Sequence, residues 1–316
     1  MSEGTVRVAI VGAGDIGRGW AALCVAAGWP VWIFDQDSQT LQGASVEIAE
    51  RARRLVSLDR ASYQDVESGL RSLRVGRSLL EACSDAEWII ESVREDLITK
   101  QKLFETFESV APGARIVTSS TSALLAKDIG ARCRRQDRIA VAHPLNPPEL
   151  IPLVELVPGP LTDGSLMDLL KGWLRSLNRI PVTIRKPVPG NVAERIAAAV
   201  WREAIDLVLN GVIDVDDLDR AVSVGPALAW AAAGPHLTYH LASGNRGVKG
   251  FLQQLLGTFE HLWSTLPTWS RLEPEQQRQL IGAIERTYQG QLEQIRASRD
   301  HRLAGILRGL EQARQG

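Results

Sequence analysis

Cysteine is scarce in this chain of 316 residues, and the three that occur, Cys24, Cys83 and Cys133, are widely spaced without a CxxC pair. An odd number of cysteines at such spacings predicts neither a disulfide framework nor a zinc site, and no metal is expected. Thiols without disulfide partners suit a reducing compartment, so the cytoplasm is the expected location.

Long apolar runs and an excess of charge of one sign are also missing. No uncharged apolar run reaches the roughly 18 residues of a membrane-spanning helix, and the N-terminus enters a strand pattern without the layout of a signal peptide. A formal net charge of -1 provides no basic surface for the phosphates of a nucleic acid. We therefore expect no membrane and no nucleic-acid partner, but a small-molecule substrate.

What is present is a regular alternation of short β-branched runs with segments of helical spacing. The expected strands cover residues 6–12, 31–35, 88–92, 115–120 and 138–143, with further strands over 151–157 and 180–184. Such alternation is typical of parallel strands joined by helical crossovers. The fold class that we predict is α/β, a Rossmann-type doubly wound, mostly parallel sheet followed by an all-α C-terminal domain.

A change of pattern marks the expected boundary between two domains. The segment "RKPVPG" (185–190) contains two prolines and a glycine, and apolar residues recur at helical spacing from there to the end. We predict a first domain over residues 1–188 and an all-helical second domain over residues 189–316.

The first motif with chemical meaning is "VGAGDIG", residues 11–17, in which Gly12, Gly14 and Gly17 form GxGxxG around Asp15 and Ile16. It follows an expected strand and opens an expected helix, where a pyrophosphate can bind backbone N–H groups. Asp35 ends the next strand, where a carboxylate can accept hydrogen bonds from the adenosine ribose and repel a 2′-phosphate. The motif favours NAD over NADP. The alternative is a glycine turn and a capping aspartate in a domain that binds no nucleotide.

A second motif is "VAHPLNPPELIPLVELV", residues 141–157, which places His143 at the end of an expected strand. Ligands of doubly wound sheets bind beyond the carboxyl ends of the strands. Glu155, expected at the end of the next strand, can fix the tautomer of His143 and stabilise the imidazolium that forms when the ring takes a proton from an alcohol. The alternative is a core histidine with a satisfied hydrogen bond.

Hydrogen-bond donors for a substrate oxygen occur at two further places. "SSTSAL" contributes hydroxyls after an expected strand, and the "NPP" segment contributes Asn146. Clusters of this kind are more often helix caps. The hydroxyl candidates are Ser119, Ser120, Thr121 and Ser122.

Together, "VGAGDIGRGWA", "ESVREDLITKQKLF", "SSTSAL" and "AHPLNPPELIPLVELV" resemble the 3-hydroxyacyl-CoA dehydrogenase superfamily over nearly the whole chain. Within it, the chain resembles the branch that contains lambda-crystallin, L-gulonate 3-dehydrogenase and L-carnitine dehydrogenase. The stretches "VWREAIDLVLNGV" and "GPALAWAAAGPHLTYHLASG" are most similar to the carnitine enzyme.

The resemblance implies an NAD-dependent dehydrogenase that acts on a CH–OH group and forms a homodimer through its helical domain. It implies that His143 and Glu155 are the catalytic pair and that Ser122 and Asn146 contact the reacting oxygen. Further, it implies that two residues lie by the nicotinamide half of NAD, Glu95 and Lys100.

Two departures from the family pattern concern the substrate. Where much of the family has phenylalanine and asparagine in "GFxxNRL", this chain has Asn191 and Glu194, and an acidic residue at the second position also occurs in carnitine enzymes. Glu194 suits a cationic substrate, and its alternative role is to stabilise a helix start or to pair with Arg195 or Arg202. Where the branch has arginine and phenylalanine, the chain has two alanines, Ala229 and Ala232.

Several alternatives stay open at this point. A 3-hydroxyacyl-CoA substrate, such as 3-hydroxybutyryl-CoA, would need basic residues for the nucleotide phosphates, and "ERARRLVSLDR" (50–60) is the candidate segment. L-gulonate is another substrate to consider, and a non-catalytic, crystallin-like role is the alternative to an enzyme. Three aromatic residues are candidates for a substrate cation site or for ordinary packing, Trp201, Trp230 and Tyr239.

Overall fold

The computed structural model describes residues 5–290 and 292–315, and the chain divides into two compact units. The first unit runs up to Arg195 and also includes Arg299–Ile306, and the second comprises Ile196–Ser298 and the chain from Leu307 onward. A compact unit is defined by its contacts and a domain by its ability to fold alone. The expected domain boundary at residues 188 and 189 therefore stays a prediction.

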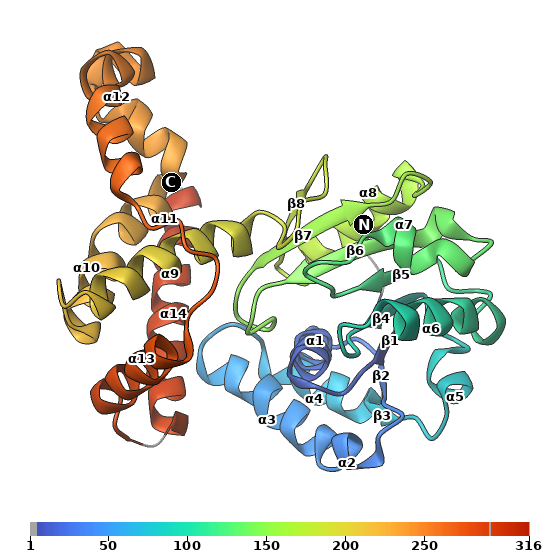
Figure 1. Ribbon diagram of the computed structural model, residues 1–316. Helices are drawn as coiled ribbons and strands as arrows, with labels where there is room; N and C mark the ends of the chain where they lie inside the picture. Colours follow the sequence, from blue (N-terminus) through green and yellow to red (C-terminus); the bar gives the residue numbers. More distant parts are fainter. Residues whose placement is uncertain (1–4, 291, 316) are drawn as a thin grey trace. The chain divides into compact units, whose positions relative to one another are not determined.

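The first unit is built around one sheet of eight strands in the order β3-β2-β1-β4-β5-β6-β7-β8. The strands are β1 (Val8–Val11), β2 (Val31–Phe34), β3 (Arg74–Val75), β4 (Trp88–Glu91), β5 (Ile116–Ser119), β6 (Ile139–Pro144), β7 (Leu153–Pro158) and β8 (Ile180–Thr183). All neighbouring pairs are parallel except β6 and β7. The predicted α/β class with a mostly parallel sheet is confirmed (Figure 1). The sequence did not reveal β3, which is only two residues long.

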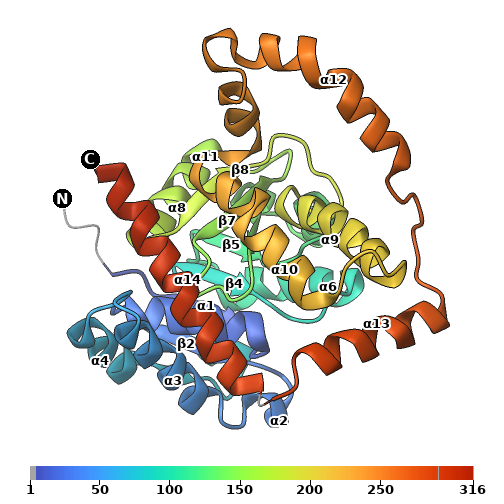
Figure 2. The same cartoon turned by 90° about the vertical axis from the view of Figure 1, so that its left-hand side faces the viewer.

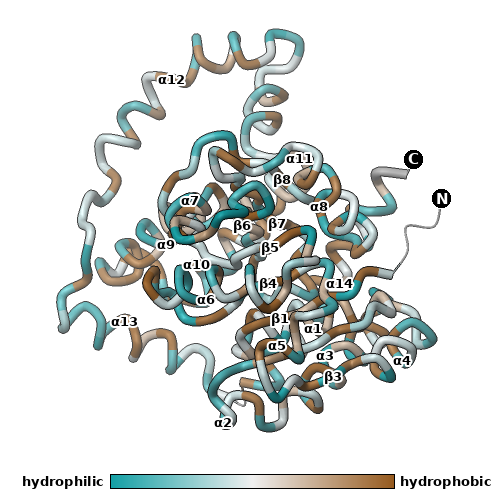
Figure 3. Tube along the Cα trace, turned by 90° about the vertical axis from the view of Figure 1, so that its right-hand side faces the viewer, coloured by the Kyte–Doolittle hydropathy of each residue, from teal (hydrophilic) through white to brown (hydrophobic). Residues whose placement is uncertain are grey.

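Helices cover both faces of this sheet because successive side chains of a buried strand point to opposite sides. In β1, Val8 and Ile10 join the hydrophobic cluster that contains Trp20 and Trp88, whereas Ala9 and Val11 join the opposite cluster with Phe104. Figure 3 shows β1 in brown, the colour of hydrophobic residues. The helices of this unit are α1 (Asp15–Ala26), α2 (Ser38–Leu41), α3 (Ala44–Ser57), α4 (Tyr63–Ser72), α5 (Leu79–Cys83), α6 (Leu97–Val110), α7 (Ala126–Ile129) and α8 (Gly164–Ser176).

Every described element of the second unit is helical, as the sequence predicts. The helices from α9 onward, drawn in yellow to red in Figure 2, are α9 (Ala193–Leu209), α10 (Val215–Val224), α11 (Pro226–Leu241), α12 (Gly247–Thr265), α13 (Pro274–Thr287) and α14 (Leu292–Gln315). Helix α11 is kinked where Gly234, at φ 73°, precedes Pro235. Within residues 5–290 and 292–315, no helix has the length and apolar character needed to cross a membrane.

Candidate active site

The glycine-rich turn between β1 and α1 contains three glycines, and the packing of the protein itself requires two of them. Gly12 has φ +105°, and a Cβ there would lie 2.5 Å from the carbonyl group of Ser92. A Cβ on Gly17 would lie 1.9 Å from the carbonyl oxygen of Gly12, whereas nothing lies within 4 Å of a Cβ on Gly14. Two glycines thus allow close packing of strand and helix, and the third leaves the backbone open at the N-terminus of α1. This arrangement fits a dinucleotide pyrophosphate.

Asp35 follows the last residue of β2 and lies next to this turn. Its Oδ2 accepts a hydrogen bond from the backbone N–H of Ala13 at 2.8 Å, and its Oδ1 accepts one from Asp37 at 3.0 Å. A cavity of about 560 Å³ is lined by Asp35, Gly14 and Gln36 among others. The backbone bonds hold the carboxylate at the cavity, where it fits the ribose of an adenosine group.

A buried ion pair lies at the carboxyl end of β4. The Nζ of Lys100 is 2.6 Å from Oε1 of Glu91, and both side chains are almost completely inaccessible to solvent. The hydroxyl of Ser119, at the end of the neighbouring β5, donates to Oε2 of Glu91 at 2.5 Å. Burial raises the pKa of Glu91, and the charge of Lys100 acts in the opposite direction. Sequence reasoning missed Glu91, although an acid that ends a buried strand is itself a signal.

Lys100 also connects this pair to the residues expected by the nicotinamide. Its Nζ lies 3.4 Å from Oε2 of Glu95, and Glu95 accepts a hydrogen bond from the hydroxyl of Thr121. Thr121 in turn accepts backbone N–H bonds from Ala123 and Leu124. Two strand ends and the start of α6 are therefore linked by a single polar network.

Some hydroxyl groups of the cluster after β5 have hydrogen-bond partners in the described part of the protein, and one does not. Ser119 and Thr121 are bound as described above, and Ser120 contacts Trp20 Nε1 at 3.2 Å and the hydroxyl of Ser92 at 2.9 Å. The hydroxyl of Ser122 has no hydrogen-bond partner among the described residues, while its carbonyl accepts a bond from Gly190 at 3.2 Å. Ser122 is thus the member of this cluster that can contact a substrate.

His143 and Glu155 face each other in the sheet. They are register partners in the antiparallel pair of β6 and β7, and Nδ1 of His143 lies 3.0 Å from Oε2 of Glu155. Both side chains are buried. Glu155 lies inside β7 rather than at the strand end that we expected, because the chain returns antiparallel immediately after β6 and brings the interior of β7 opposite His143.

The second oxygen of Glu155 binds the beginning of α9. Oε1 accepts the backbone N–H groups of Val192 and Ala193, each at 2.9 Å, so the carboxylate caps the helix. This places Glu194 in the first turn of α9, with its Oε1 3.4 Å from Nε2 of His143. The imidazole therefore has a carboxylate beside each of its nitrogens.

The two arginines that were alternative partners of Glu194 bind elsewhere. Arg195 donates to the carbonyl of Pro189 and Arg202 to the carbonyl of Trp269, each at 3.5 Å. Within the described part of the chain, neither forms an ion pair with Glu194. About half of the Glu194 side chain, 48%, stays exposed to solvent.

Two asparagines of the segments that follow β6 and precede α9 differ in exposure and in hydrogen bonding. Asn146 is exposed, and its Nδ2 donates to Oδ2 of Asp15 at 3.2 Å, which ties the loop after β6 to the start of α1. Asn191 is buried at φ 48°, and its Nδ2 lacks a hydrogen-bond partner in the described residues. A buried donor without a partner is costly unless a ligand satisfies it.

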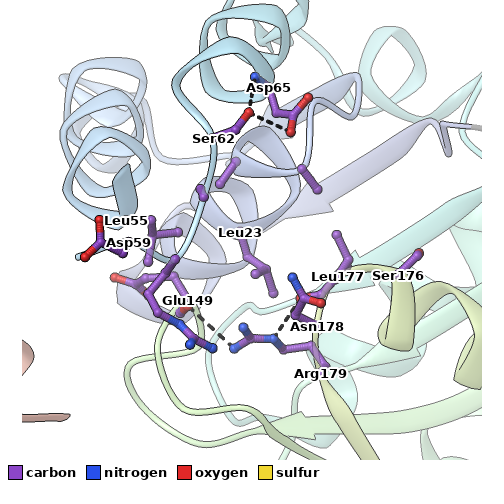
Figure 4. A pocket seen from close by; sticks show the side chains of 14 residues that line it. Leu23, Leu55, Asp59, Ser62, Asp65, Glu149, Ser176, Leu177, Asn178 and Arg179 are labelled. Carbon is purple, nitrogen blue, oxygen red and sulfur yellow. Dashed lines mark hydrogen bonds between the residues drawn. The ribbon is translucent and has the colours of Figure 1, made fainter. Parts of the chain in front are cut away.

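The loop that joins β6 to β7 is held from behind by Arg179, which sequence reasoning also missed. Its Nη1 donates to the carbonyls of Pro148 at 3.2 Å and Ile151 at 3.1 Å. Figure 4 shows Arg179 and Glu149 on the wall of a cavity of about 610 Å³. Oε1 of Glu149 is 3.5 Å from Arg51, Oε2 has no hydrogen-bond partner among the described residues, and burial raises the pKa of this carboxyl group.

The three aromatic candidates belong to the second unit. Tyr239 packs against Phe251 and Phe259 at centroid distances of 5.1 and 5.6 Å. Trp201 is 60% exposed, and neither it nor Trp230 makes a ring contact with Tyr239 in the described residues. Their role at a substrate cation stays a prediction.

Comparisons with known proteins identify two family models that match this chain. A family model described as the NAD binding domain of 3-hydroxyacyl-CoA dehydrogenase matches residues 7–187, and the model of the C-terminal domain matches residues 190–279.

Curated relatives include an L-carnitine dehydrogenase of Nocardiopsis dassonvillei, 32% identical over 98% of this chain and 93% of that protein. An L-carnitine dehydrogenase of Burkholderia mallei is 38% identical over 82% of this chain and 79% of its own length. Among solved structures, 5-formyl-3-hydroxy-2-methylpyridine 4-carboxylic acid 5-dehydrogenase, an NAD⁺-dependent dismutase, matches with a TM-score of 0.81 at 26% identity, over 98% of this chain and 99% of that one.

Proposed function

This chain belongs to the 3-hydroxyacyl-CoA dehydrogenase family, and from that premise we propose that it oxidises the 3-hydroxyl of a small cationic 3-hydroxy acid, such as carnitine, to a 3-keto product. Membership makes it an NAD-dependent dehydrogenase that acts on a CH–OH group. The substrate and the roles of individual residues are the proposal.

In this proposal His143 is the general base. Its contact with Glu155 keeps a proton on Nδ1 and leaves Nε2 to accept the hydroxyl proton of the substrate. NAD, when bound, accepts the hydride that leaves the carbinol carbon. Ser122 and Asn146 contact the reacting oxygen, and the amide of Asn146 has a second N–H for this contact besides the one that binds Asp15.

The cofactor residues of the proposal surround the glycine-rich turn and the network at β4. Gly12, Gly14, Asp15, Ile16 and Gly17 form the pyrophosphate turn and Asp35 binds the adenosine ribose, a set that the open backbone at Gly14 supports. Glu95 and Lys100 lie by the nicotinamide half, with Lys100 anchored by Glu91.

The observation that carries the cationic substrate is the position of Glu194. Its carboxylate lies beside Nε2 of His143, the atom that the substrate hydroxyl must approach. In a carnitine-like acid, the quaternary nitrogen is attached to the carbon next to the carbinol carbon. A carboxylate at the hydroxyl site therefore lies next to the cation as well, and opposite charges at such a distance attract. The relatives named L-carnitine dehydrogenase point the same way.

A CoA thioester would need arginines for its phosphates, and three arginines of the candidate segment are already paired with carboxylates. Arg51 pairs with Asp15 and Glu47, while the neighbouring arginines of the segment also have carboxylate partners. Arg53 pairs with Glu67 and Arg54 with Asp300. Phosphates would have to displace these carboxylates, so we favour a free acid.

A substrate panel tests the proposal. L-carnitine, L-gulonate, 3-hydroxybutyrate and 3-hydroxybutyryl-CoA are each assayed with NAD for the formation of NADH. The highest kcat/KM is expected for carnitine. A preference for gulonate or for the thioester would overturn the assignment of a cationic substrate, and inactivity on all four would favour the crystallin-like alternative.

Two further expectations are proposals of assembly and location. Helices α11 and α12 expose many apolar side chains, among them Leu237, Leu241, Leu252 and Trp263, which suits a homodimer interface in the helical domain. Light scattering after size exclusion should give twice the mass of one chain. Cys24, Cys83 and Cys133 are free and buried, which agrees with the cytoplasm as the proposed location.

A further inference from the structure

Glu194 contacts the nitrogen of His143 that Glu155 does not bind. Oε1 of Glu194 lies 3.4 Å from Nε2, while Nδ1 is already bound to Glu155. A neutral imidazole with its proton on Nδ1 would present a lone pair to the carboxylate, and two acceptors repel each other. The contact is favourable only when Nε2 also carries a proton.

A protonated Nε2 cannot serve as a general base. Oxidation breaks the O–H and C–H bonds of the alcohol, sends the hydride to NAD⁺ and the proton to Nε2, and forms the C=O bond. With Glu194 in place, that acceptor position on the ring is occupied and the carboxylate fills the space of the substrate hydroxyl. The contact thus describes a resting, inactive arrangement.

Glu194 is free to leave this arrangement, whereas Glu155 is not. Both oxygens of Glu155 are bound, one to His143 and the other to the backbone N–H groups of Val192 and Ala193. Glu194 has no partner besides His143 among the described residues, and 48% of its side chain is exposed. A side chain with a single contact and access to solvent can rotate at little cost.

From these observations we propose that Glu194 is a substrate-operated gate on His143: a quaternary ammonium group draws the carboxylate away from Nε2, the ring then releases its Nε2 proton to solvent, and the freed nitrogen accepts the hydroxyl proton. This inference rests on the proposed function and extends it, because the cation acts on turnover as well as on binding. Substrates without a cationic group leave the pair closed, and only the minor open fraction of the protein oxidises them.

The decisive experiment separates the cation from the hydroxy acid. The protein is assayed with 3-hydroxybutyrate and NAD, with and without tetramethylammonium chloride, and with sodium chloride at equal concentration as the control for ionic strength. We expect tetramethylammonium to raise kcat/KM by about fivefold in the wild type. The Glu194→Gln variant should already oxidise 3-hydroxybutyrate about fivefold faster than the wild type and should not respond to the cation.

Carnitine should show the opposite response. Glu194→Gln is expected to lower kcat/KM for carnitine by about tenfold. Asp168→Asn is the matched control, because it removes an exposed carboxylate of the same unit, one that pairs with Lys171 on its own helix. This variant should have the wild-type kcat/KM for both carnitine and 3-hydroxybutyrate.

A second measurement follows the protonation of His143 directly, in the absence of turnover. The Nε2 signal of His143 is identified in ¹⁵N NMR spectra of the histidine rings by its loss in a His143→Asn variant. Its chemical shift should move from the range of a protonated nitrogen to that of an unprotonated one when tetramethylammonium is added. A signal that stays unchanged, or a Glu194→Gln variant that loses activity equally on both substrates, would overturn the gate. An unchanged signal leaves the oxidation of carnitine by the wild-type protein untouched, and that oxidation is measured in its own assay, so the gate and the proposed function fail separately. If carnitine is not oxidised, the tetramethylammonium experiment still decides on the gate.

Discussion

The side of the first unit that we propose for the cofactor and the side that we propose for the substrate are built in different ways. On the cofactor side, the turn at Gly12 and the carboxylate of Asp35 follow parallel strands and are held mainly by backbone contacts. On the substrate side, His143, Glu155 and Glu194 come from an antiparallel pair and from a helix start further along the chain. A site built from backbone is fixed by the fold, whereas a site built from side chains of distant segments can carry a movable part.

The two sides also differ in how completely their charges are partnered. Glu91 and Lys100 on the cofactor side are buried and bound to each other, so Lys100 cannot move away without leaving the Glu91 carboxylate buried and unpaired. Glu194 on the substrate side is half exposed and has one contact. Under the proposed function, rigidity therefore belongs to cofactor placement and adaptability to the choice of substrate.

The largest expected effect is on stability and concerns the buried pair. Lys100→Met leaves the Glu91 carboxylate buried without its counter-charge, which should lower the free energy of unfolding by about 3–5 kcal/mol. Denaturant titration followed by circular dichroism measures this loss. Lys127→Met, at an exposed lysine, is the control and should change little. If Lys100→Met has the same free energy of unfolding as the control, the ion pair does not stabilise the fold, and the proposed cofactor side is less rigid than we infer.

The next effect concerns catalysis on the substrate side. His143→Ala should lower kcat by about 100-fold or more, because general-base catalysis is typically worth that much. The affinity for NADH, measured by fluorescence titration, should stay near the wild-type value since the cofactor side is untouched. Near-normal turnover of the variant would return His143 to the role of a core histidine.

The third prediction concerns the difference in affinity between NADH and NADPH. The carboxylate of Asp35 would repel a 2′-phosphate, so NADH should bind more tightly than NADPH by on the order of 2 kcal/mol, about 30-fold. Asp35→Asn removes the charge and keeps an acceptor oxygen for the N–H of Ala13, and it should bring the two affinities closer together. Equal affinities in the wild-type protein would contradict the role of Asp35.

The smallest effect concerns Glu149, behind the loop of the substrate side. Burial raises the pKa of this carboxyl group, so the folded protein holds its proton more readily than the unfolded chain. The stabilising contribution is present below the unfolded pKa of about 4.3 and is lost as the pH rises through the raised folded value. At pH 7, Glu149→Gln should therefore be more stable than the wild type by about 1 kcal/mol.

The pH series completes this test. The advantage of Glu149→Gln should disappear below about pH 4, where the wild-type carboxyl group is protonated in both states. Glu50→Gln, at an exposed glutamate of α3, should match the wild type throughout. A destabilised Glu149→Gln would show that the contact with Arg51 outweighs the cost of burial.

Local sequence patterns were enough to predict seven of the eight strands, the glycine turn and the position of His143 near the end of a strand. These features depend on local physics, namely the alternation of apolar residues, the space that only glycine leaves and the spacing from turn to Asp35. The tertiary structure decided that Glu155 lies opposite His143 inside β7, that Arg179 supports the connecting loop, and that Glu194 reaches Nε2. Such contacts join distant positions of the chain, and their register follows from the antiparallel return and the capping of α9, which no local pattern specifies.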